Sequence, residues 1–152
     1  MLAEPVLLDT DTLSELSRGN AAVTARARTY LAEFGRLTIS AVTVFERLRG
    51  YRHAIREGKP FERQLQAFET LVAESIVLPF DQEAADAAAS IWSGVTRRQR
   101  HQLGDILIAA VAVARQLPLA TRNRRDFESF GKASGLTLRL VDWATTAKRV
   151  TR

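Results

Sequence analysis

The sequence contains no cysteine, and His53 and His101 are its only histidines. Disulfide bonds and thiolate metal centres are therefore excluded, and a histidine-rich zinc site is not expected. A metal held by this chain would take oxygen ligands, which favours Mg²⁺ or Mn²⁺.

Long apolar runs are also absent. No stretch approaches the roughly 20 apolar residues that a membrane span requires. Glu4 and Asp9 interrupt the short apolar run at the start, so the sequence gives no secretory signal. These absences predict a cytoplasmic protein without a membrane partner. With 152 residues, the chain is long enough to bury a core, and we expect 1–152 to form a single domain.

Lysine is scarce: of the 22 cationic side chains, only Lys59, Lys132 and Lys148 are lysines, and the others are arginines. The formal net charge is +5 and the sequence pI is about 10.4. The planar guanidinium group of arginine suits phosphate and carboxylate, so a polyanion or an acidic partner is consistent with this charge. A genome rich in G and C would give the same bias, so composition alone does not decide between these explanations.

Short apolar segments alternate with amphipathic ones along the whole chain. Strands are predicted at 5–9, 36–40, 75–80, 118–121 and 136–141, and helices at 10–19, 20–35, 41–58, 61–74, 82–95, 104–117 and 125–133. The alternation predicts an α/β fold of three layers, α/β/α, with a central, mainly parallel sheet of about five strands.

Four acidic residues occupy special positions in this pattern. Asp9 ends the first strand, Glu46 lies in the helix after the second, Asp105 begins an apolar helix, and Asp126 follows the strand 118–121. Ligands of parallel sheets bind beyond the carboxyl ends of the strands. Asp9, Asp105 and Asp126, taken singly, are explained as turn or cap residues. Glu46 is different, because it lies inside the apolar run "ISAVTVFERL", where burial of a lone carboxylate is costly. Together, four converging carboxylates repel one another unless a divalent cation joins them, and such a cation activates water for attack on a phosphoryl group.

The opening stretch "LLDTDTL" resembles the first motif of haloacid-dehalogenase-type phosphatases. In that interpretation Asp9 is the nucleophile, and "GKP" (58–60) and "GD" (104–105) correspond to two later motifs. The later acidic motif should follow a strand and contain a second acid, whereas Asp105 starts the apolar run "ILIAAVAV". The phosphatase is therefore the weaker alternative.

A second resemblance covers most of the chain. The segments "LLDTDTLSEL", "ISAVTVFERLRG", "LPFDQEAADAAASI" and "GDILIAAVAVARQLPLATRNRRDF" occur in the order typical of PIN-domain ribonucleases, and specifically of VapC toxins from toxin–antitoxin modules. The resemblance implies an acidic quartet of Asp9, Glu46, Asp105 and Asp126 that binds Mg²⁺ or Mn²⁺ and hydrolyses RNA phosphodiesters.

Further residues gain roles from the same resemblance. The family commonly has Asn or Ser where this chain has Asp11, which adds a fifth carboxylate. Thr121 and Asn123 match positions that line the pocket, and a hydroxyl and an amide at these places suit hydrogen bonds to the ligating acids. Thr10 and Asp11 are expected to support the acids in the same way.

The expected partners follow from the resemblance and from the charge. Among the many arginines, Arg122, Arg124 and Arg125 are the best candidates for contacts with RNA phosphates or a protein partner, because they border Asn123 and Asp126. The family implies a VapB-type antitoxin, homodimers and toxin–antitoxin hetero-oligomers, with operator DNA bound only through the antitoxin. A PIN-like module that binds RNA or protein without cutting stays open as a third interpretation.

Overall fold

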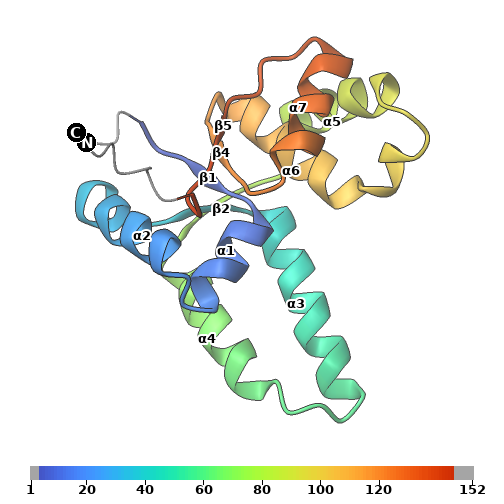
Figure 1. Cartoon of the computed structure of the whole chain (residues 1–152). Helices are drawn as coiled ribbons and strands as arrows, with labels where there is room; N and C mark the ends of the chain where they lie inside the picture. Colours follow the sequence, from blue (N-terminus) through green and yellow to red (C-terminus); the bar gives the residue numbers. More distant parts are fainter. Residues whose placement is uncertain (1–3, 146–152) are drawn as a thin grey trace.

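Figure 1 shows a computed structural model of the chain, which describes residues 4–145. The strands are β1 (Leu7–Leu8), β2 (Thr38–Ser40), β3 (Ile76–Leu78), β4 (Leu119–Ala120) and β5 (Leu140–Val141). The helices are α1 (Thr10–Ser17), α2 (Ala21–Phe34), α3 (Ala41–Arg56), α4 (Glu62–Ala73), α5 (Gln82–Gly94), α6 (Leu103–Arg115) and α7 (Arg124–Ser134), with a short 3-10 helix η1 (Gln99–His101) before α6.

The strands form one sheet in the order β3-β2-β1-β4-β5, and every neighbouring pair is parallel. Strand β1 therefore lies at the centre, with Leu7 paired to Thr38 of β2 on one side and to Leu119 of β4 on the other. The carboxyl ends of these three strands meet at one edge of the sheet. The predicted three-layer fold with a parallel five-stranded sheet is confirmed.

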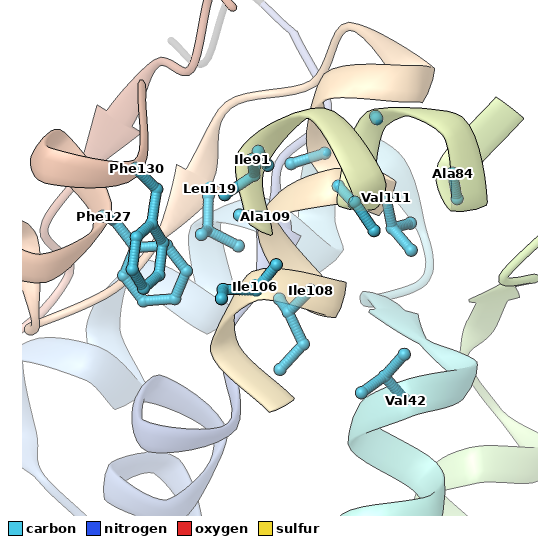
Figure 2. Close-up of a cluster of buried hydrophobic side chains, with 14 of the residues drawn as sticks. Val42, Ala84, Ile91, Ile106, Ile108, Ala109, Val111, Leu119, Phe127 and Phe130 are labelled. Atoms are coloured by element: carbon cyan, nitrogen blue, oxygen red, sulfur yellow. The ribbon is translucent and has the colours of Figure 1, made fainter. Parts of the chain in front are cut away.

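Alternation along β1 and β4 separates two hydrophobic clusters, one on each face of the sheet. Leu7 and Leu119 point into a cluster built with α5, α6 and α7, which Figure 2 shows around Ile106 and Phe127. Leu8 and Ala120 point to the opposite face, where side chains of α1, α2 and α4 pack. Helix α6 contributes six buried residues, as its almost wholly apolar sequence predicts.

Several predicted helix ends are confirmed by their hydrogen bonds. The side chain of Asn20 accepts from the Val23 backbone N–H, and that of Asp81 accepts from the Ala84 backbone N–H. Gly35 follows α2 with φ 78°, a conformation that glycine adopts without strain.

The strands are shorter than the sequence predicts. Of the predicted strand 136–141, only Leu140–Val141 pairs, because its single neighbour β4 is itself two residues long. Strand β3 lies at the edge of the sheet and leaves Ile76 and Val77 exposed, which an apolar run does not by itself predict. Within the described residues, no helix is long and apolar enough to cross a membrane.

Candidate active site

The carboxyl ends of the three central strands carry the residues of the candidate site. Asp9 follows β1, Ser40 ends β2 and caps α3, and Thr121 follows β4. The Asp9 backbone N–H donates to the Ala120 carbonyl oxygen at 2.9 Å, which holds Asp9 next to Thr121. Asp9 and Thr121 are both buried, so the site begins inside the protein rather than on its surface.

The Asp9 carboxylate accepts two hydrogen bonds. The Thr10 backbone N–H donates to Oδ1 at 2.7 Å, and the Thr121 hydroxyl donates to Oδ2 at 2.8 Å. Burial, and then the negative charges of Asp11 and Asp105, raise the pKa of Asp9 to about 8, although these hydrogen bonds oppose the rise. Asp9 thus caps α1 and also lies within a group of like charges.

Asp11 lies beside Asp9. The Thr121 hydroxyl is 3.4 Å from Oδ2 of Asp11 as well, and the Arg122 backbone N–H donates to the same oxygen at 3.2 Å. Because Asp9 is the cap of α1, Asp11 is free to face β4 across the edge of the sheet. The expected fifth carboxylate is therefore next to the first one.

Glu46 reaches the site from the second turn of α3. The Thr10 hydroxyl donates to Oε1 of Glu46 at 3.0 Å and is itself 3.1 Å from the Thr43 hydroxyl, which supports its position. Its other oxygen lies against Gly104, where a Cβ would be only 2.6 Å from Oε2. Gly104 was not predicted as a site residue. The only feature of the sequence that pointed to it is a glycine inside the first turn of a helix, directly before Asp105, where the backbone does not require glycine.

Asp105 and Asp126 complete the acidic group from the first turns of α6 and α7. Burial raises the pKa of Asp105 to about 6, together with the charges of Glu46, Asp11 and Asp126. The Gln102 side-chain N–H donates to Oδ2 of Asp126 at 3.0 Å. Gln102 is a second residue that sequence reasoning missed, because no local pattern connects it with an acid 24 positions later.

The structure thus gathers all four predicted acids and Asp11 around one edge of the sheet. Among residues 4–145, no group of three or more acidic or histidine side chains is arranged to hold a metal ion as it stands. The donor chemistry nevertheless suits Mg²⁺ or Mn²⁺, since every candidate ligand is a carboxylate. Burial, and after it the charges of neighbouring acids, raise the pKa values of Asp9 and Asp105, and a bound cation would offset that negative charge.

The remaining predicted residues lie around this group. The Asn123 backbone N–H donates to the Thr121 hydroxyl at 3.0 Å, and its side chain makes no capping bond to α7. Arg122 extends to Glu15 at 3.3 Å, and Arg124 lies 3.7 Å from Glu128. Arg125 borders a cavity that also contains Asp126.

Arg47, one of many arginines that could have faced RNA, is instead structural. It donates to the Ser14 hydroxyl at 2.8 Å and to the Tyr51 hydroxyl at 2.7 Å, and it stacks 5.5 Å from the centre of the Phe68 ring. It therefore joins α1, α3 and α4 next to Glu46.

Comparison with known protein families shows which family has this arrangement. The profile of the PIN domain matches residues 6–133. The chain belongs to the PIN-domain family, in its VapC branch. A curated relative is the tRNA(fMet)-specific endonuclease VapC of Shigella flexneri, 35% identical over 112 residues, which are 72% of this chain and 77% of the relative.

Solved structures agree with this assignment. The DNA-bound VapBC of Salmonella typhimurium matches with a TM-score of 0.69 and 25% identity, over 94% of this chain and 99% of the other. VapBC-1 of nontypeable Haemophilus influenzae has the same fold, with a TM-score of 0.70 and 21% identity over 93% and 100% of the two chains. FitAB bound to the IR36 DNA fragment also shares it, with a TM-score of 0.65 and 21% identity over 95% and 99%.

In this PIN domain, the phosphatase alternative loses its structural basis. Asp105 lies in the first turn of α6 after η1, not after a strand. The corresponding acidic motif is therefore absent at that position.

Proposed function

We propose that this PIN domain is a metal-dependent endoribonuclease, the toxin of a toxin–antitoxin system. The observation that carries the proposal is the electrostatic contact of Asp105 with Glu46, Asp11 and Asp126, since these acids come from four different helices. Nothing in local folding requires four helices to bring like charges together, so a shared cationic ligand is the simplest purpose of the arrangement.

Asp9, Glu46, Asp105 and Asp126 would hold the metal, and Asp9 and Asp105 are the first candidates for direct ligands. Bound Mg²⁺ or Mn²⁺ would lower the pKa of water and offset the charge that develops on phosphoryl oxygens. Asp11 would strengthen the negative potential of the site. The assignment to the VapC branch supports RNA as the substrate, and the Shigella flexneri relative is named as an endonuclease specific for tRNA(fMet).

The hydroxyls and the amide would fix the acids. Thr121 orients Asp9, Thr10 orients Glu46, and Gln102 orients Asp126. Hydrogen bonds of this kind hold carboxylates in one rotamer, which lowers the entropy lost when they converge on an ion.

A protein partner is part of the proposal. Structural neighbours are VapBC and FitAB complexes, some of them bound to DNA. They support a VapB-type antitoxin for this chain, with homodimers and hetero-oligomers, and with operator DNA bound through the antitoxin.

The test is cleavage of a panel of structured RNAs by the purified chain, with Mg²⁺, with Mn²⁺ and with EDTA. We expect cleavage with either ion and none with EDTA. Asp9→Asn, prepared in the same way, should be inactive while keeping its circular dichroism spectrum. Retained activity in Asp9→Asn would show that a contaminant cuts the RNA or that Asp9 has no role.

The same panel separates the nuclease from the non-catalytic alternative. A binding module would retain RNA in a gel-shift assay with and without a divalent ion and would release no fragments. That result would replace the ribonuclease with an RNA-binding function at the same site.

A further inference from the structure

Two adjoining cavities run along α7, away from the acidic group. The first, of about 700 Å³, has Asn123 and Asp126 in its wall. The second, of about 500 Å³, extends to Lys132. Because the two share Thr96, Gln99, Arg125 and Ser129, they form one continuous depression, which we call the α7 groove.

Contacts between α7 and the segment 94–102 join the two walls of the α7 groove and fix their separation. The Gln99 side chain accepts from the Thr96 backbone N–H at 2.9 Å and donates to the Ser129 hydroxyl, so it joins the two walls. At the far end, Gly94 packs so closely on α7 that a Cβ would overlap the Ala133 carbonyl oxygen. The groove is therefore formed before any ligand binds.

The lining of the α7 groove suits an anionic polymer. All residues that line its first part are polar or charged. Arg98, Arg125 and Lys132 line the groove, and within residues 4–145 none of them is in an ion pair. Its acids are Asp126, at the end nearest the acidic group, and Glu128, which lies near Arg124.

The geometry of α7 orders these contacts along a line. Positions 125, 129 and 132 recur at i, i+4 and i+7 and share one helix face. Seven residues of α-helix rise by roughly 10 Å, so Arg125 and Lys132 are placed to contact two different phosphates of an extended strand rather than one phosphate.

We propose that the α7 groove binds the segment of single-stranded RNA next to the phosphodiester that is cut, with Arg98, Arg125 and Lys132 on its phosphates. The proposal rests on the proposed ribonuclease function and adds the path of the strand. A docked protein tail is the less suitable occupant, because such tails anchor through apolar side chains, and every residue that lines the first part of the groove is polar or charged. Of the two arginines that begin α7, the groove selects Arg125 over Arg124.

The test measures binding of a fluorescently labelled single-stranded RNA by anisotropy, in EDTA and at several salt concentrations. The variants are Arg98→Gln, Arg125→Gln and Lys132→Gln. Arg28→Gln is the matched control, since it removes the same charge from an exposed position on α2. We expect each groove variant to weaken binding about five- to tenfold near 0.1 M salt and to lower the salt slope by about 1. Arg28→Gln should match the wild type, and Arg125→Lys should keep the slope.

Equal effects of the groove variants and Arg28→Gln would overturn the proposal. An oligoglutamate peptide of the same charge is the second probe; groove-dependent binding of the peptide but not of RNA would also overturn it. If the protein cuts RNA but the groove variants bind RNA like the wild type, the proposed strand path is rejected and the proposed ribonuclease function is retained. If the groove variants weaken RNA binding but no RNA is cut, the groove is retained as an RNA-binding site and the ribonuclease function is rejected.

Discussion

Gly104 lies against the Glu46 carboxylate: a Cβ at 104 would be 2.6 Å from Oε2 of Glu46, so the carboxylate would have to move to make room for it. The contact joins the start of α6, which carries Asp105, to the second turn of α3. It makes the position of one acid depend on the absence of a side chain next to another.

Gly104→Ala should therefore lower RNA cleavage, because the methyl group displaces the Glu46 carboxylate. We expect a loss of about 100-fold, the scale of a displacement near 1 Å in a catalytic group. Gly50→Ala, in the exposed part of α3 with open space at its Cβ, is the control and should keep activity while stabilising the helix by roughly 0.5–1 kcal/mol. Equal activity in the two variants would contradict the close contact.

The metal-free protein should lose stability as pH rises from 5 to 8. Asp9 and Asp105 have folded-state pKa values of about 8 and about 6, above the ordinary 3.8, so the folded chain binds more protons than the unfolded chain in this range. Stability then falls with rising pH, by up to about 1.4 kcal/mol per pH unit for each such group between its two pKa values. Urea unfolding in EDTA at pH 5, 6, 7 and 8 measures the slope.

Asp9→Asn isolates the contribution of Asp9 to that slope. The amide cannot ionise, so the variant should be more stable than the wild type at pH 8 in EDTA and nearly equal to it at pH 5. Addition of Mg²⁺ at pH 8 should stabilise the wild type more than the variant. Parallel pH profiles for the two proteins would mean that Asp9 ionises without hindrance.

Thr121→Val should weaken the site without emptying it. The Thr121 hydroxyl lowers the pKa of Asp9 by donating to it, so its loss should raise that pKa further. We expect metal affinity to fall about 10- to 100-fold and the rise of the cleavage rate with pH to move to higher pH. Thr29→Val, at an exposed position of α2, is the control. An unchanged pH profile would show that the Thr121 hydroxyl does not influence the pKa of Asp9.

Arg47→Met should destabilise the fold and leave the salt dependence of RNA binding unchanged. Its guanidinium bonds join Ser14 and Tyr51, whose hydroxyls would lose their partner, and the cost should be roughly 1–3 kcal/mol. Denaturant unfolding measures the first effect and anisotropy titrations the second. A lowered salt slope with unchanged stability would place Arg47 on the RNA instead.

The sequence predicted the layers and the order of elements because both depend on local hydrophobic patterns. Asp9, Glu46 and Asp126 could be placed near one edge because parallel strands align their carboxyl ends, whereas Asp105 follows no strand and joined them only through the resemblance to PIN domains. Gly104 and Gln102 could not be predicted, since each acts through a residue more than 20 positions away. The structural role of Arg47 could not be predicted for a related reason: its inward orientation depends on Ser14 and Phe68, which lie in other helices.

The central position of β1 has a consequence for the newly synthesised chain. The first strand to leave the ribosome carries Asp9, but its neighbour β4 and the Thr121 hydroxyl follow more than 100 residues later. A nascent polypeptide that ends before this point lacks part of the proposed active site, however well its first half has folded. Termination of translation before β4 would therefore leave the proposed nuclease inactive, and activity would arise only when translation is nearly finished.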